Sequence, residues 1–110
     1  MAERGPTIST HILDTGRGRP AAGVRVTLFR IAEDGRPMRV TDALTDGDGR
    51  VADLLERPLQ EGLYRLRFDV GDHGPYFDAV AVDVRIDDVR RGHHVPLLLS
   101  PYGLSIYRGS

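Results

Sequence analysis

The sequence predicts an all-β domain of the sandwich class, and three observations support this prediction. Short segments that alternate apolar and polar residues recur along the 110 residues, with turns rich in glycine and proline between them. No segment keeps the period of an amphipathic helix, and the one candidate, 54–57, stops at Pro58. About eight such segments fit one sandwich, and a chain of this length supports one core. We therefore expect a single domain over residues 1–110 with a flexible segment at 1–6.

The expected strands cover, in chain order, residues 7–13, 24–31, 37–44, 51–55, 63–70, 79–86, 93–99 and 103–108. The clearest is 63–70, whose inward positions are all apolar: Tyr64, Leu66, Phe68 and Val70. Residues 79–86 repeat this alternation, whereas 51–55 is long enough only for a short strand. The Asp34-Gly35 pair predicts a tight turn between 24–31 and 37–44.

Two segments depart from regular strand chemistry. Pro96 lies inside 93–99 and cannot donate to a ladder, which predicts a bulge or an edge position there. In 71–79, Gly71, Gly74 and Pro75 disfavour any helix longer than one turn.

Composition excludes several classes of function. The 15 basic residues are all arginine and are balanced by 16 acids to a net charge of -1. This balance predicts no nucleic-acid partner and no membrane partner. The absence of cysteine excludes disulfides, thiolate ligands and a cysteine nucleophile. Residues 1–6 do not resemble a signal peptide, and the apolar runs are too short to cross a bilayer, so we expect a cytoplasmic protein.

Metal ligation is also disfavoured. The four histidines have no zinc-site spacing. The segment Asp46-Gly47-Asp48-Gly49-Arg50 lacks the further acids of a calcium loop and is better interpreted as a turn that delivers Arg50 to the next strand. We therefore expect no metal and no cofactor.

Two histidines lie away from the apolar faces of their strands. His11 alternates with Ile8 and Ile12, and His94 lies opposite the apolar face of 93–99. A solvated surface histidine is the simpler interpretation of either one. Imidazole is nevertheless the side chain best suited to proton transfer near neutral pH.

Arg50 is ordinarily a surface charge, but in a cleft it would offer a fixed fork of donors to an anion. His73, in a glycine-rich loop, is expected to be solvated.

Four parts of the sequence, in order along the chain, resemble motifs of the transthyretin-related 5-hydroxyisourate hydrolases. They are Thr10-His11-Ile12-Leu13-Asp14 with 18–24, Thr45-Asp46-Gly47-Asp48-Gly49-Arg50, the segment 94–103, and the terminal Tyr107-Arg108-Gly109-Ser110. The turn is weak evidence alone, whereas the His94 strand together with the terminal tetrapeptide is specific. The segment 71–79 is shorter than in this family, so the family's short helix is expected to be reduced or absent.

The resemblance implies a transthyretin-like sandwich of two four-stranded sheets that assembles as a homotetramer, a dimer of dimers. It implies hydrolysis of 5-hydroxyisourate, a small molecule with a cyclic amide, to 2-oxo-4-hydroxy-4-carboxy-5-ureidoimidazoline in urate breakdown. The catalytic residues so implied are His11, Arg50, His94 and Ser110. The implied substrate-binding residues are His11, Arg50, Tyr107, Arg108 and Gly109. The alternatives are a transthyretin-type carrier of small ligands and a structural or adhesive β-sandwich module.

Overall fold

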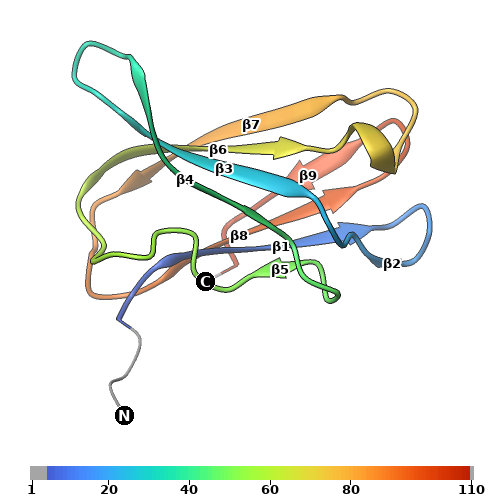
Figure 1. Cartoon of the computed structure of the whole chain (residues 1–110), viewed down its shortest axis with the longest axis horizontal. Helices are drawn as coiled ribbons and strands as arrows, with labels where there is room; N and C mark the ends of the chain where they lie inside the picture. Colours follow the sequence, from blue (N-terminus) through green and yellow to red (C-terminus); the bar gives the residue numbers. More distant parts are fainter. Residues whose placement is uncertain (1–4, 110) are drawn as a thin grey trace.

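A computed structural model describes residues 5–109. The chain forms two packed β-sheets, which Figure 1 shows as two layers. One sheet contains β3 (Arg25–Ile31), β4 (Pro37–Leu44), β6 (Gly62–Asp69) and β7 (Ala79–Ile86), in the order β4-β3-β6-β7. The other contains β1 (Ile8–Asp14), β2 (Arg19–Pro20), β5 (Arg50–Val51), β8 (His93–Leu99) and β9 (Leu104–Ile106). Its order is β2-β1-β8-β9, and β5 pairs with β1.

The predicted all-β sandwich is confirmed. Residues 1–4 of the expected flexible segment, and Ser110 of the expected site, lie outside the described residues.

The core lies between the two sheets and is built from the inward positions that the alternation predicts. Burying a side chain such as leucine, isoleucine or phenylalanine completely contributes roughly 1.5–3 kcal/mol. The five-stranded sheet supplies Ile8, Ile12, Val51, Val95, Leu97 and Leu99, and the four-stranded sheet supplies Val26, Leu28, Tyr64, Leu66, Phe68 and Ile86. Buried residues of the connecting segments complete it: Ala21, Val24, Leu54, Leu55, Leu59 and Val70.

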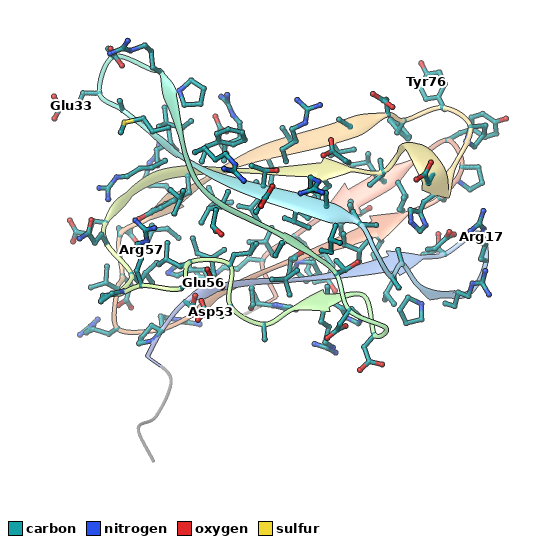
Figure 2. All side chains as sticks on the ribbon, viewed as in Figure 1. Arg17, Glu33, Asp53, Glu56, Arg57 and Tyr76 are labelled. Atoms are coloured by element: carbon teal, nitrogen blue, oxygen red, sulfur yellow. The ribbon has the colours of Figure 1, made fainter. Side chains whose placement is uncertain are left out.

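The hairpin between β3 and β4 has the tight turn that its sequence predicts. The amide of Gly35 donates to the carbonyl oxygen of Ala32 over 2.8 Å. The amide of Ala32 donates to the carbonyl oxygen of Arg36 over 2.9 Å. Figure 2 shows Glu33 at the tip of this hairpin, directed away from the sandwich. Local turn chemistry is therefore sufficient to define this part of the fold.

Two short strands differ from the prediction. The strand expected at 51–55 contains only Arg50–Val51. Residues Arg19 and Pro20 form β2 against β1, so this sheet has five strands where four were expected. Two residues are too few to show an alternation, and for this reason the sequence pattern did not reveal β2.

Pro96 lies in an interior strand without a bulge, so the expectation of a bulge or an edge strand was wrong. The parallel register of β8 with β1 runs without a shift from Ile8↔His93 to Asp14↔Leu99. The carbonyl oxygen of Pro96 accepts a long 3.4 Å bond from the Tyr107 amide. The nitrogen and the carbonyl group of one strand residue point to the same neighbouring strand, so the Pro96 nitrogen, which has no hydrogen to donate, also faces this end of the chain. The ladder between β8 and β9 ends one pair earlier, at Leu97↔Ile106. Pro96 is therefore accommodated where that ladder stops.

The segment before β7 contains one 3-10 turn, η1 (Gly71–His73). This confirms the prediction of at most one helical turn. Within residues 5–109, nothing helical is long and apolar enough to span a membrane.

His73 is not solvated, which corrects the sequence prediction. Its side chain is 16% exposed, and Nδ1 lies 3.9 Å from Oδ2 of Asp14, the buried last residue of β1. Neither of these two atoms has a hydrogen-bond partner among residues 5–109. Tertiary packing of η1 against the end of β1 buries the imidazole, and the glycine-rich loop sequence gave no sign of this contact.

Gly49 allows the turn before β5 to pack against β1. Its φ is +74°, and a Cβ at this position would lie 2.4 Å from the carbonyl oxygen of Ile12. The Gly49 carbonyl oxygen accepts a 2.8 Å bond from the Ile12 amide. The close approach holds β5 in place beside β1.

We predict that Gly49→Ala lowers the free energy of unfolding by about 2–4 kcal/mol, since the left-handed conformation and the steric overlap both penalise a Cβ. Gly23→Ala is the matched control, because Gly23 has the same φ of +74° but no atom within 4 Å of the added Cβ. That variant should lose only about 1–2 kcal/mol. Urea denaturation measures both, and equal losses would contradict the steric argument.

Candidate active site

Three predicted site residues lie on one face of the five-stranded sheet. His11 on β1 pairs directly with Arg50 on β5, and His94 on β8 pairs with Ser9 on β1. Paired residues of adjacent strands point to the same face, and residues two apart on one strand do as well. The residues Ser9, His11, Arg50 and His94 therefore share the face that points away from the core, which we call the site face. Ile8 and Ile12 occupy the opposite, buried face of β1.

The turn that carries Arg50 is organised by one carboxylate. Oδ1 of Asp46 accepts hydrogen bonds from the backbone amides of Asp48 and Arg50, over 2.9 and 3.0 Å. The Asp46 amide in turn donates to the Arg50 carbonyl oxygen over 3.0 Å. Aspartate commonly closes a turn in this way, because its short side chain reaches amides two or more residues further on. Asp46 therefore shapes the backbone of the turn, and this is the turn before Arg50 that the sequence predicted.

The guanidinium of Arg50 differs from those of Arg25 and Arg65 on the other sheet, which contact carboxylates. On the outer face of the four-stranded sheet, Arg65 makes two bonds to Asp83, of 2.7 and 3.1 Å, and Arg25 contacts Asp42 over 2.8 Å. Hydrogen bonding to Arg65 lowers the pKa of Asp83. Among residues 5–109, the structure gives the Arg50 side chain no hydrogen-bond or ion-pair partner. Its donors are therefore open to a bound anion or a developing negative charge.

His94 is held by Ser9 and favours its neutral form. The Ser9 hydroxyl oxygen lies 2.9 Å from Nδ1 of His94. Burial lowers the pKa of His94, and the positive charge of Arg50 and the neighbouring His11 lower it further. A histidine with a lowered pKa keeps a free nitrogen lone pair at neutral pH and is able to accept a proton.

The tail of the chain approaches the same histidine. The amide of Gly109 donates to the carbonyl oxygen of His94 over 2.8 Å. A pocket of about 380 Å³ is lined by Ser9, Thr10, Arg50, Val51, Ala52, His94 and Gly109. A second pocket, of about 240 Å³, also includes His94 and is lined by Val82, Val84, Arg85, His93, Val95, Ile106, Tyr107 and Arg108. His94 therefore borders both hollows.

The structure brings most of the predicted site residues together in two groups around His94. Arg50, His94 and Gly109 share the first pocket, and His94, Tyr107 and Arg108 share the second. His11 lies next to Arg50 in the sheet but does not line the first pocket. Tyr107 is 51% exposed. Sequence reasoning missed Ser9, whose partner lies 85 residues away, although its position on the same face as His11 was a signal.

His93, unlike its neighbour His94, lies on the core side of β8. Its side chain is buried on the core face, and Nε2 lies 2.9 Å from the carbonyl oxygen of Asp88. In the described part of the chain, no group of three or more His, Asp or Glu side chains is arranged to hold a metal ion. The site face therefore offers a proton acceptor, a second imidazole and a guanidinium. This set is able to activate water and to stabilise an oxyanion.

Comparison with known proteins extends the resemblance to nearly the whole chain. Residues 8–109 match the model of the HIUase/Transthyretin family. The 5-hydroxyisourate hydrolase of Deinococcus radiodurans is 44% identical over 116 residues, which cover 96% of this chain and 97% of that protein. The solved structure of Klebsiella pneumoniae 5-hydroxyisourate hydrolase has a TM-score of 0.81 at 34% identity and covers 94% of this chain and 99% of that one. Sea bream transthyretin in complex with thyroxine has a TM-score of 0.84 at 25% identity, with 92% of each chain covered.

We predict that Arg50→Gln raises the pKa of His94, because the substitution removes a positive charge that disfavours the imidazolium. The pKa is measured by an NMR titration of the His94 ring protons at low salt, where the interaction of exposed charges is least screened. Arg36→Gln is the control, since Arg36 is exposed and pairs with Asp34 in the β3–β4 hairpin. Equal shifts in the two variants would mean that only net charge, and not the position of Arg50, affects His94.

Proposed function

The chain belongs to the HIUase/Transthyretin family, and we propose that it is a 5-hydroxyisourate hydrolase that acts in urate breakdown. The observation that carries this proposal is the register of β1 with β5 and β8. In this register Arg50, whose side chain has no partner within residues 5–109, pairs with His11, and His94 pairs with Ser9, two residues before His11 on the same face. The relatives from Deinococcus radiodurans and Klebsiella pneumoniae bear the name of this enzyme.

The proposed reaction opens the cyclic amide of the substrate. A histidine of the site face accepts a proton from water while the water oxygen forms a bond to the ring carbonyl carbon. The carbonyl oxygen gains negative charge, and the Arg50 guanidinium stabilises it. The C–N bond then breaks, and the protonated histidine returns its proton to the leaving nitrogen. The product is 2-oxo-4-hydroxy-4-carboxy-5-ureidoimidazoline. His11 is among the groups that lower the pKa of His94, after burial and the charge of Arg50.

The tail residues are proposed to contact the substrate. Gly109 supports this proposal because it lines the pocket that contains Arg50 and His94, and Tyr107 and Arg108 support it because they line the adjoining one. Ser110 is also proposed as a catalytic residue, on the basis of the sequence motif alone.

We further propose that the working enzyme is a homotetramer in the cytoplasm. The argument for assembly is that the candidate groups lie on an outer sheet face and not inside a closed cavity. A second sheet placed over this face would exclude bulk water, which strengthens the electrostatic interactions on which the proposed reaction depends.

The direct test follows the decay of freshly generated 5-hydroxyisourate by its ultraviolet absorbance, with and without the protein. We expect decay clearly faster than the spontaneous reaction and proportional to protein concentration. An unchanged decay combined with saturable binding of a small aromatic ligand would instead favour a carrier. The relative solved in complex with thyroxine has the same fold.

His11→Asn and His94→Asn are each predicted to lower kcat by at least ~100-fold, the low end for the loss of general acid–base catalysis. The free energy of unfolding should change by less than about 1 kcal/mol, because neither imidazole lies on the buried face of its strand. His73→Asn is the control and should keep its kcat, since His73 contacts Asp14 beyond the site face. Near-normal turnover in either site variant would remove that histidine from the mechanism.

A further inference from the structure

We propose that Ser9 is a positioning residue that fixes the ring orientation and the tautomer of His94. Its hydroxyl oxygen accepts a hydrogen bond from the Nδ1–H group, which leaves the lone pair of Nε2 as the proton acceptor. This inference rests on the proposed hydrolysis. It assigns which nitrogen of His94 accepts the proton.

The contact follows from the sheet register. Ser9 and His94 are directly paired in the parallel ladder of β1 and β8, and Oγ lies 2.9 Å from Nδ1. Both backbones are fixed on their outer sides as well. β1 is paired with β5, and the Gly109 amide bonds to the His94 carbonyl oxygen of β8. The distance is therefore set by the two strands and does not depend on a flexible loop.

The other edge of the ring is closed by Gly109. A Cβ at this glycine would lie 2.5 Å from Cδ2 and 3.2 Å from Cγ of His94, and 3.1 Å from Cγ of Pro96. Nδ1 and Cδ2 are the two ring atoms bonded to Cγ, so they lie on opposite edges of the imidazole. Ser9 thus stands at one edge and the Gly109 backbone at the other. A flipped ring would lose its hydrogen bond and would place Nδ1 against the glycine backbone.

The proposed role of His94 then assigns the tautomer. A neutral imidazole carries one proton, and a serine hydroxyl is able to donate to or accept from Nδ1. Nδ1 is occupied by Ser9, so Nε2 is the nitrogen left to meet a substrate or water. Nε2 is able to accept a proton only when the ring proton is on Nδ1, so the proposed role of His94 as proton acceptor assigns that proton to Nδ1, with the Ser9 oxygen as its acceptor. Burial and the charge of Arg50 disfavour a second ring proton.

The tautomer is tested by NMR, which needs no turnover. The carbon and nitrogen chemical shifts of His94 distinguish Nδ1–H from Nε2–H imidazole at a pH where the ring is neutral. We expect Nδ1–H in the wild-type protein and a change toward Nε2–H, the form favoured in water, in Ser9→Ala. Ser9→Thr keeps a hydroxyl and should restore the wild-type signature. An Nε2–H ring in the wild type, or an unchanged tautomer in Ser9→Ala, would overturn the proposal.

Kinetics supply the second measurement. We expect Ser9→Ala to lower kcat by about tenfold or more with KM changed less than about twofold, since groups that orient a functional imidazole typically matter at this level. Ser9→Thr should recover most of the rate. Ser100→Ala is the matched control, because it also removes a serine hydrogen bond of 2.9 Å, to the carbonyl oxygen of Gly103 in the turn before β9.

The two proposals fail in different ways. Wild-type protein that does not accelerate the decay of 5-hydroxyisourate would contradict the proposed function, whatever the NMR result. An active wild type in which Ser9→Ala turns over as fast as Ser100→Ala would contradict only the role of Ser9.

Discussion

The parallel pairing of β1 with β8 is the constraint on which the rest of the site depends. These strands are far apart in sequence, and the whole four-stranded sheet is formed by the chain between them. Their register is fixed by the buried side of the ladder, where Ile12 pairs with Leu97, and by a buried 2.6 Å bond from the Thr10 hydroxyl to the Val95 carbonyl oxygen. A slip of one residue would turn His94 toward the core and Val95 toward solvent. The hydrophobic core therefore determines which polar groups reach the site face.

The two outer faces of the sandwich use charge differently. On the four-stranded sheet, arginines such as Arg65 lie against carboxylates in adjacent strands, an arrangement that satisfies their donors locally. On the site face, Arg50 has no such partner within residues 5–109, and its charge instead lowers the pKa of His94. Arg65 is thus paired with a carboxylate on its own surface, whereas Arg50 is able to bind and polarise a small molecule.

The tail reaches the site because Pro96 and Gly109 change the β8–β9 ladder in complementary ways. Pro96 cannot donate, so regular pairing ends after Ile106, yet its carbonyl oxygen still accepts a long bond from the Tyr107 amide. Two residues later, the Gly109 amide bonds to the carbonyl oxygen of His94, and the absence of a side chain lets the backbone lie against the imidazole. The end of the chain is thereby brought to the edge of the His94 ring.

The sequence by itself determined the features that depend on near neighbours. Alternation fixed which faces of their strands His11 and His94 occupy, and turn chemistry placed Arg50 at the start of a strand and limited η1 to one turn. Only the tertiary structure decided which residues meet across the chain: β2 pairing with β1, His73 buried against Asp14, and Ser9 at hydrogen-bond distance from His94. The physical reason is that strand periodicity and turn conformation arise within a few residues, whereas strand partners and register are selected by packing of the whole core.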